Sequence, residues 1–440
     1  MADYLAASPA DRERMLAKIG AKDITDLYES VPEKLRVKGN LHLPAGLDEM
    51  SVRREMEALA RKNTVFPTVL RGAGAYRHYI PAVVPEIVSK ETFVTAYTPY
   101  QAEISQGVLQ SIFEYQTVIC ELTGMDVSNA SVYDGATAAA EAAASCRDRR
   151  RKTVLVSACA HPDVLRVMKT YAWAADTPLT VVPEKNGRTD MEALAGLLDS
   201  SVAAVYVPQV NYYGCIEEAE EAARLAHEAG AKLILGVDPL AAVLLKSAAD
   251  CGADIAVGEG QQLGMPLSWG GPFLGFMAAK HDMMRKLPGR IVGETKDDAG
   301  NRAFVLTLQA REQHIKREKA SSNICSNEAL CAMTASVYAA AMGPEGLRQA
   351  ALQSMSKAHY LAQELEKIGW RRAFEADFFQ EFVTEAPEGT DIAAALAALE
   401  KAGILGGLPL GGGRVLWCAT EVVSRQEMDR TAQILKEVRA

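Results

Sequence analysis

The sequence contains no Cys-x-x-Cys pair, no long apolar run and no excess of basic residues, and each absence excludes a class of protein. The eight cysteines are scattered, so neither a zinc knuckle nor a redox dithiol is favoured. No segment approaches the roughly 20 apolar residues that a membrane-spanning helix needs. The formal net charge of −9 argues against binding to a phosphate backbone, because nucleic-acid-binding proteins are normally basic. We therefore expect no metal, no membrane and no nucleic acid.

Secretory features are also missing from the beginning of the sequence. Residues 1–20 carry several charged side chains and no apolar core of signal-peptide length. We therefore expect a cytoplasmic protein with free thiols. The 440 residues, 49% of them hydrophobic, suit one large globular unit or two tightly joined domains.

Three regions differ in their sequence patterns. Residues 1–90 mix helical stretches, at 8–19 and 47–61, with segments such as 71–76 and 80–81 that cannot easily continue a helix. We expect this region to be an arm that packs on another surface. The predicted large domain spans residues 91–343, and residues 344–440 are predicted to form a small α+β domain.

Short apolar runs alternate with helical segments in the large domain. The predicted strands cover residues 153–157, 179–182, 202–207, 232–237, 255–258 and 273–278, with helices at 191–198 and 217–229 between some of them. Strands that are apolar throughout suit a buried parallel sheet. The expected architecture is therefore α/β, with a mostly parallel sheet and helices on both faces.

Further helices are predicted from the helical spacing of apolar residues. One such face comprises Ile104, Val108, Ile112, Ile119 and Leu122, with Gly124 as the helix stop. An alanine-rich helix is expected at 136–151, followed near the C-terminus by helices at 330–342, 347–368, 391–402 and 424–438 and strands at 378–384 and 415–419.

Three positions follow predicted strands or begin helices, where α/β sheets bind ligands. Gly135 lies in a small-residue turn at a helix start, where free N–H groups attract phosphate, although a helix capped by Asp134 or Thr137 explains it as simply. His161 could stack on an aromatic cofactor, and Asp238 could pair with a pyridinium nitrogen. Each is more often a loop or turn residue when taken alone. Their order is that of aminotransferase-type pyridoxal-phosphate (PLP) folds, so we expect a PLP-dependent transferase fold of type I.

The lysine that a PLP enzyme needs for its Schiff base is missing. It should follow the strand after Asp238, but residues 258–266 contain no lysine. Lys246 comes before that strand. Lys280 comes after a further strand, where an exposed strand end is the simpler explanation.

Two polar segments complete the candidate features. Residues 97–107 are dense in hydroxyl and amide groups and precede an apolar helix, so they either cap that helix, through Thr98, or line a site in a neighbouring chain. Residues 311–319 are predicted to form a solvated helix with paired charges.

The chain resembles the glycine cleavage system P-protein family, the glycine decarboxylases, and in particular the first subunit of its two-subunit type. The resemblance rests on residues 71–81, 97–107, 122–126 with 129–134, and 311–325, and it extends over nearly the whole chain. In that family a homologous partner subunit carries PLP on a lysine. Matching Pro266 and Gly270-Gly271-Pro272 to the partner's motif puts Gln261 at the lysine position. An amide cannot form an imine, so the resemblance implies a relic cofactor site with Gly135, His161, Asp238 and Gln261 at the former binding positions.

The resemblance also implies the reaction and the partners. The pair would decarboxylate glycine and transfer an aminomethyl group to the lipoyl arm of the H-protein, in an α2β2 assembly with its active site between two chains. PLP would be held by the partner subunit. The side chains expected to reach that shared site are Tyr97, Tyr100, Gln101, Glu103 and Gln106. Two alternatives stay open at this point, a self-sufficient PLP enzyme that uses Lys280 and a non-catalytic scaffold subunit.

Overall fold

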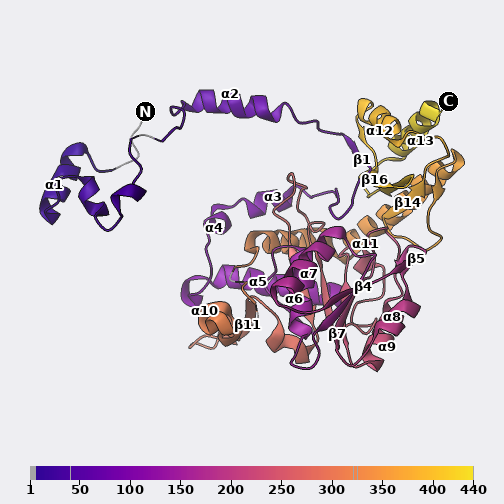
Figure 1. The fold of residues 1–440 in the computed structure, drawn as a ribbon, viewed down its shortest axis with the longest axis horizontal. Coiled ribbons are helices and arrows are strands. Elements are labelled where there is room, and N and C mark those ends of the chain that lie inside the picture. The colour runs from indigo at the N-terminus through magenta and orange to yellow at the C-terminus, as the bar shows by residue number, and fades with distance from the viewer. Residues whose placement is uncertain (1–5, 40, 321, 325, 440) are drawn as a thin grey trace. The chain divides into compact units, whose positions relative to one another are not determined.

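The chain divides into two compact units, Met1–Val65 and Phe66–Ala440, in a computed structural model that describes residues 6–39, 41–320, 322–324 and 326–439. The first unit contains the helices α1 (Pro9–Ile19) and α2 (Glu49–Ala60), which confirms both predicted helices (Figure 1). Ser8 and Asp11 form a capping box at the start of α1, and Gly20 ends it in the left-handed conformation. None of the unit's described residues is buried. Its described apolar side chains are therefore exposed or partly exposed, and the arm predicted for residues 1–90 stays a prediction.

The second unit is built around a seven-stranded sheet in the order β2-β10-β9-β8-β7-β3-β4. Its strands are β2 (Val127–Ser128), β3 (Thr153–Ser157), β4 (Leu179–Val182), β7 (Val202–Pro208), β8 (Lys232–Gly236), β9 (Ile255–Glu259) and β10 (Gly275–Ala279). Only β10 runs antiparallel to its neighbours in this sheet. The predicted strands and the mostly parallel sheet are therefore confirmed.

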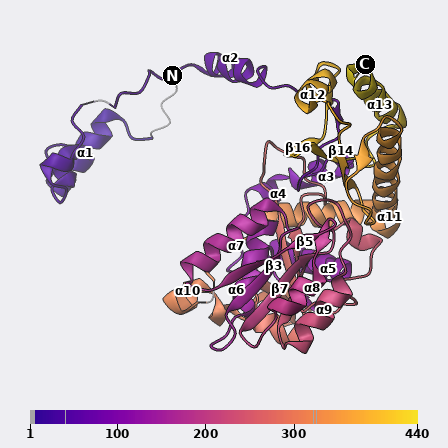
Figure 2. The same cartoon turned by 45° about the vertical axis from the view of Figure 1, so that its right-hand side comes forward.

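Helices cover both faces of this sheet, because apolar side chains of its strands point alternately to the two sides. On β3, Val154 and Val156 join one hydrophobic cluster, whereas Leu155 joins the other. The first cluster includes α6 (Gly135–Cys146) and α7 (Pro162–Ala174), which lie side by side (Figures 1 and 2). The second includes α5 (Gln106–Thr123), α9 (Ala219–Glu228) and α11 (Ala329–Lys367).

Two helix predictions need correction. Ile104 lies before α5 and is 80% exposed, so it is not part of the apolar face, whereas Gly124 does end the helix, with a φ of 71°. Helix α6 ends at Cys146 and does not continue to residue 151. The reason is local, since the Asp148 carboxylate accepts the N–H groups of Arg150 and Arg151 and holds this stretch as a turn.

The C-terminal part forms an antiparallel sheet, in the order β13-β14-β17-β16, with its own hydrophobic cluster. It comprises β13 (Arg371–Arg372), β14 (Glu381–Glu385), β16 (Leu408–Gly411), β17 (Arg414–Cys418), α12 (Ile392–Lys401) and α13 (Arg425–Arg439). This confirms the small α+β fold. The two helices predicted before it are joined as α11, with a kink at Gly343, whose φ is 62°, before Pro344. The predicted domain boundaries at 90 and 343 stay a prediction.

Residues 311–319 do not form the predicted solvated helix. They form the short turns η6 (Gln309–Arg311), α10 (Gln313–Lys316) and η7 (Arg317–Lys319), and Glu312 is buried. Arg311 Nη2 donates to the Gly289 carbonyl at 2.6 Å, which ties the segment to the body of the unit. Arg317 has a φ of 54°, which interrupts the helix.

The remaining elements are short. They are η1 (Ile24–Tyr28), η2 (Glu33–Leu35), β1 (Thr68–Val69), α3 (Val83–Val88), α4 (Glu91–Val94), η3 (Ala102–Ile104), β5 (Glu184–Lys185), β6 (Arg188–Thr189), α8 (Met191–Leu197), η4 (Ala241–Val243), η5 (His281–Lys286), β11 (Ile291–Lys296), β12 (Arg302–Thr307) and β15 (Ile404–Leu405). Among the described residues, none of the helices combines the length and the apolar character needed to cross a bilayer.

Candidate functional site

A cavity of about 280 Å³ lies at the carboxyl ends of the parallel strands. Three of the four positions predicted for a relic cofactor site, Gly135, His161 and Asp238, line it. The fourth, Gln261, is buried nearby and does not line it. The structure therefore brings three of the predicted residues together around one space, as expected where strands of an α/β sheet end.

Gly135 begins helix α6 at one wall of this cavity. Asp134 caps the helix, because its Oδ1 accepts the Thr137 N–H at 2.7 Å. The Gly135 N–H points to the Glu259 carboxyl, with Oε2 at 2.9 Å. Glu259 Oε1 also accepts the N–H groups of Leu274, at 2.8 Å, and Gln261, at 3.1 Å. Burial raises the pKa of Glu259 to about 7, although these hydrogen bonds act in the opposite direction.

His161 is fixed between its own helix and the 71–76 loop. Its Nδ1 accepts the Asp163 N–H at 3.1 Å, and its Nε2 lies 2.9 Å from the Ala73 carbonyl oxygen. These contacts fit the neutral ring with its proton on Nε2. The ring also meets Tyr212 edge-on, with centroids 5.1 Å apart. The loop and helix α7 therefore hold both nitrogen atoms at the edge of the ring that was expected to stack on a cofactor.

Asp238 combines a turn contact with an amide pair. Its Oδ1 accepts the N–H groups of Leu240 and Ala241, each at 2.9 Å, which is the turn role considered from the sequence. Its Oδ2 accepts Nε2 of Gln262 at 2.7 Å and Nε2 of Gln380 at 3.3 Å. Burial raises the pKa of this carboxyl despite these donors. Two amide side chains therefore occupy the oxygen expected to face a pyridinium nitrogen.

Gln261 binds the backbone of the 71–76 loop. Its Oε1 accepts the Tyr76 N–H, and its Nε2 donates to the Tyr76 carbonyl, both at 2.9 Å. Nε2 also donates to the Met265 carbonyl at 2.7 Å. With 1% of its surface exposed, the side chain is enclosed by these partners. Gln261 is thus a structural link at the position matched to the Schiff-base lysine.

The cavity lining includes no lysine and no arginine. Lys280 follows β10, and Ala279 at the end of that strand pairs with Ile255 at the beginning of β9. The cavity lies at the other end of β9, at Glu259, so Lys280 is on the opposite edge of the sheet. There its Nζ lies 3.9 Å from the Asp254 carboxylate. The described residues therefore do not fit covalently bound PLP in this cavity, and the Lys280 alternative is not favoured.

Glu381 holds the 71–76 loop from the C-terminal sheet. Its Oε1 accepts the Ala73 N–H and its Oε2 accepts the Tyr76 hydroxyl, both at 2.6 Å. Burial raises the pKa of Glu381 to about 7, against the effect of these bonds. Neither Glu381 nor Glu259 was expected from the sequence. Glu381 is the first residue of β14 and Glu259 is the last residue of β9. This position at the end of a strand is the only local signal that could have indicated them.

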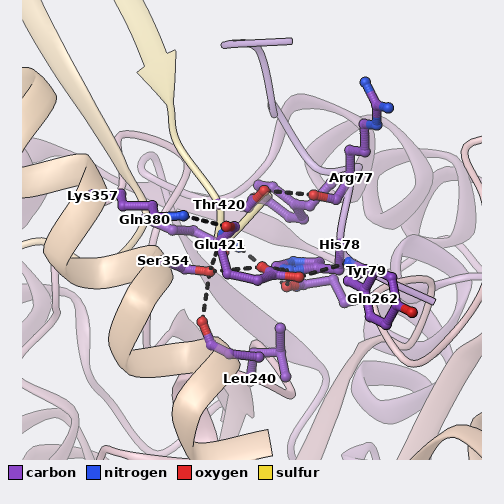
Figure 3. A network of polar contacts seen from close by, with 12 residues as sticks. Arg77, His78, Tyr79, Leu240, Gln262, Ser354, Lys357, Gln380, Thr420 and Glu421 are labelled. Atoms are coloured by element: carbon purple, nitrogen blue, oxygen red, sulfur yellow. Dashed lines mark hydrogen bonds and ion pairs between the residues drawn. The ribbon is translucent and has the colours of Figure 1, made fainter. Parts of the chain in front are cut away.

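A second network joins residues after the loop to α11 and the C-terminal part (Figure 3). His78 Nδ1 lies 2.7 Å from Glu421 Oε2, and His78 Nε2 lies 3.0 Å from Gln262 Oε1. Both ring nitrogens therefore lie within hydrogen-bond distance of an oxygen atom. Glu421 Oε1 also accepts the Tyr79 N–H at 2.7 Å, and Ser354 donates its hydroxyl to Oε2 at 3.2 Å. Burial alone would raise the pKa of Glu421, but His78 and the Tyr79 N–H bring it below its ordinary value.

The 97–107 segment has the opposite character, because most of its predicted site residues are exposed. Tyr97 is 87% exposed, and Gln101 and Glu103 are also exposed. Tyr100 is half exposed, and its hydroxyl accepts Nη2 of the buried Arg290 at 3.2 Å. Capping of α5 by Thr98 is wrong, since Ser105 is at the N-cap. Three of the five predicted residues, Tyr97, Gln101 and Glu103, thus have exposed side chains, whereas the Tyr100 hydroxyl is bound to Arg290.

Gln106 differs from the other four. Its Nε2 donates to the carbonyl groups of Ala102, at 2.7 Å, and Phe304, at 2.9 Å, while its Oε1 accepts the Phe304 N–H at 2.9 Å. The side chain therefore ties the 97–107 segment to strand β12. No group of three His, Cys, Asp or Glu residues that could hold a metal ion occurs among the described residues.

Comparison with solved structures defines the class of fold. The alanine–glyoxylate aminotransferase from Nostoc sp. matches with a TM-score of 0.60 at 15% identity, over 86% of this chain and 96% of that chain. The aspartate aminotransferase from Thermus thermophilus matches with a TM-score of 0.59 at 17% identity, over 84% and 98% of the two chains. At these identities the likeness concerns the fold alone. The chain has the fold of PLP-dependent aminotransferases, as predicted.

More similar proteins define the family. The model of the glycine cleavage system P-protein family matches residues 2–435. The probable glycine dehydrogenase (decarboxylating) subunit 1 of Moorella thermoacetica is 48% identical over 447 residues, covering 99% of this chain and all of that protein. A crystal structure of glycine decarboxylase (P-protein) in inhibitor-bound form matches with a TM-score of 0.93 at 41% identity, over 99% and 100% of the chains. The chain belongs to the glycine cleavage system P-protein family.

Proposed function

We propose that this chain is the subunit of a two-chain glycine decarboxylase that contributes side chains, while a homologous partner subunit holds PLP. The pair would decarboxylate glycine and pass the aminomethyl group to the lipoyl arm of the H-protein. The observation that carries the proposal is the near-complete match to relatives named subunit 1 of glycine dehydrogenase (decarboxylating), which include one from Carboxydothermus hydrogenoformans that is 47% identical over 98% of this chain and 99% of that protein. A subunit of that name implies a second one.

The cavity of this chain supports the assignment of PLP to the partner. A Schiff base needs a lysine, and the position matched to it is Gln261. The cavity lining is also acidic, with Asp134, Asp238, Glu259 and Glu381 among its residues. A cofactor phosphate would meet these carboxyl groups without a lysine or arginine to balance its charge. PLP in the partner would supply the electron sink for the loss of carbon dioxide.

We further propose that the 97–107 segment reaches the partner's active site. Tyr97, Gln101 and Glu103 make no side-chain hydrogen bond or ion pair to any residue that the structure describes, so their polar groups are free to contact another chain. Tyr100 is oriented by Arg290, whose guanidinium carbon also lies 5.3 Å from the ring centroid. Gln106 is best assigned a positioning role, because its amide is fully used in holding the segment. A phenol or carboxylate of this segment could then orient glycine or move a proton.

The proposed assembly is α2β2 and cytoplasmic, with bound glycine and H-protein as its other partners. The thiols support a reducing compartment, since the described cysteines are all free. They are Cys120, Cys146, Cys159, Cys215, Cys251, Cys331 and Cys418.

Reconstitution tests the proposed function. Each chain is purified alone, and carbon dioxide release from glycine is measured with lipoylated H-protein for each chain and for the pair. We expect activity only in the pair, and a mass of the complex that corresponds to two copies of each chain. An active isolated chain, or an inactive pair that nevertheless assembles and contains PLP, would overturn the proposal.

A further inference from the structure

Helix α6 begins at one wall of the cavity. The helix has 12 residues, and N–H groups at the start of a helix of this length attract phosphate or carboxylate groups. In this chain the Gly135 N–H donates to Glu259, whose strand β9 ends at the same wall. The Glu259 carboxyl group therefore lies where a bound anion would be expected.

The fit between Glu259 and this wall is close. A Cβ atom added to Gly135 would lie 3.0 Å from both the Cβ and the backbone nitrogen of Glu259, so no larger residue fits there without movement. Three backbone N–H groups, from Gly135, Leu274 and Gln261, converge on the two carboxyl oxygens. Such a convergence is typical of a bound anion, and here a side chain of the same protein provides it.

The 71–76 loop contacts His161 at the Nε2 edge of its ring. Gly74 has a φ of 101°, and a Cβ atom at this residue would lie 2.6 Å from His161 Nε2. Glycine is thus required by both the backbone conformation and the contact with the ring. Gln261 and Glu381 hold the loop in this place through Tyr76 and Ala73, on opposite sides.

We propose that this chain has filled the phosphate point of its own cofactor site, with the Glu259 carboxyl group in place of the cofactor phosphate, while the 71–76 loop holds the Nε2 edge of His161. The closure involves more than the missing lysine. Restoring a lysine at position 261 alone would leave the phosphate point occupied and would also remove the Gln261 amide from the loop. This inference rests on the proposed function, which assigns PLP to the partner subunit. Its test uses this chain alone, so the inference and the proposed function can fail separately.

The first test asks whether removal of Glu259 exposes an anion site. The full-length chain, wild type and Glu259→Ala, is melted in rising inorganic phosphate, and the same melts in sodium chloride of equal ionic strength are subtracted. In the variant the three N–H groups lose their acceptor, so we expect the melting temperature to rise by about 2–3 °C at phosphate about a hundredfold above its Kd. The wild type should show no phosphate-specific rise. The inference is overturned by equal responses in the two proteins.

A matched control uses the other buried carboxyl group of the cavity. Glu381→Gln changes a side chain of similar burial that does not contact α6, so it should show no phosphate-specific rise. Glu259→Gln should also show none, because an amide of the same size still fills the space. A phosphate response in either of these two variants equal to that of Glu259→Ala would contradict the assignment of the phosphate point to Glu259.

A second test stands if Glu259→Ala does not fold. Gln261→Lys is mixed with PLP, and the absorbance of an imine and the mass of the borohydride-reduced chain are measured. We expect no imine at position 261 at equimolar PLP, since the phosphate point is filled by Glu259. A stoichiometric imine formed by this single substitution would show that the cavity is open to the cofactor, and would overturn the inference.

Discussion

The polar side chains around the cavity and those of the 97–107 segment differ in their burial and in their hydrogen-bond partners. Around the cavity, Gln261 and Glu381 are buried and Glu259 is partly buried, and each of them binds backbone or side-chain groups of the same chain. In the segment, Tyr97 and Glu103 are exposed and have no such partner among the described residues. Internal partners make a group structural, whereas exposed groups on a fixed frame remain available to another molecule. Substitutions at the cavity should therefore change stability, and substitutions in the segment should change turnover by the pair.

The largest effect on stability is expected at His78. His78→Ala leaves Glu421, whose side chain is only 11% exposed, without the ring that it faces. Removing one partner of such a buried pair is strongly destabilising, so the free energy of unfolding should fall by about 4 kcal/mol. Urea unfolding measures this, with the exposed His281→Ala as control, which should change by less than about 0.5 kcal/mol. Equal effects of the two substitutions would mean that the network does not hold the cavity wall.

A pH effect on stability is expected at Glu381. Its pKa rises from 4.5 to about 7 on folding because of burial, so the folded state binds the extra proton between these values. The stabilising contribution of the protonated group is complete below pH 4.5 and is lost as the pH rises through 7. Between pH 5 and 8 the wild type should thus lose about 3 kcal/mol relative to Glu381→Gln, whose amide does not titrate. The exposed Glu385→Gln on the same strand should follow the wild type, and parallel curves for all three proteins would contradict this account.

The largest effect on turnover is expected in the segment. Glu103→Gln or Tyr97→Phe should lower glycine-dependent carbon dioxide release by the pair about 10²-fold, which is the scale of a lost proton-transfer or orienting group. Assembly and unfolding of the variants should stay unchanged, because neither side chain has a partner within the described chain. Matched controls are Glu388→Gln and Tyr28→Phe, which are exposed elsewhere and should keep full activity. Turnover that survives both segment substitutions would favour a scaffold role for this chain.

A smaller effect, on both stability and turnover, is expected at Gln106. Gln106→Ala removes three hydrogen bonds to backbone groups and should lower the free energy of unfolding by about 2 kcal/mol. Because the segment would lose its tie to β12, kcat of the pair should also fall, by about tenfold, with little change in KM. Gln110→Ala on the same helix removes only a contact with the exposed Glu114 and is the control. A change in stability without any change in kcat would contradict the positioning role proposed for Gln106.

The parts of the fold that depend on local patterns were predictable. The strands β3, β4, β7, β8 and β9 are apolar runs, so their positions followed from the sequence to within about two residues. Charge pattern was a poorer guide, because residues 311–319 carry alternating charges and yet contain the buried Glu312. Their course depends on Arg311, which binds carbonyl groups of residues far away in the sequence.

The positions of Gly135, His161 and Asp238 could be predicted for the site, because each follows a strand or begins a helix. The groups that close the cavity could not, since their contacts join residues 124 positions apart, for Gly135 and Glu259, and 305 apart, for Tyr76 and Glu381. No local pattern indicates such pairs. The proposed role of the 97–107 segment likewise depends on a second chain. The sequence of this chain therefore shows which polar residues the segment contains, but not what they contact.

The location of the cofactor in the active pair tests the central claim most directly. The assembled complex is reduced with borohydride, which fixes any PLP imine, and the pyridoxyl-labelled lysine is found by peptide mapping. We predict one label per pair of chains, all of it on a lysine of the partner subunit and none on this chain. A stoichiometric label on a lysine of this chain, such as Lys280, would contradict the account.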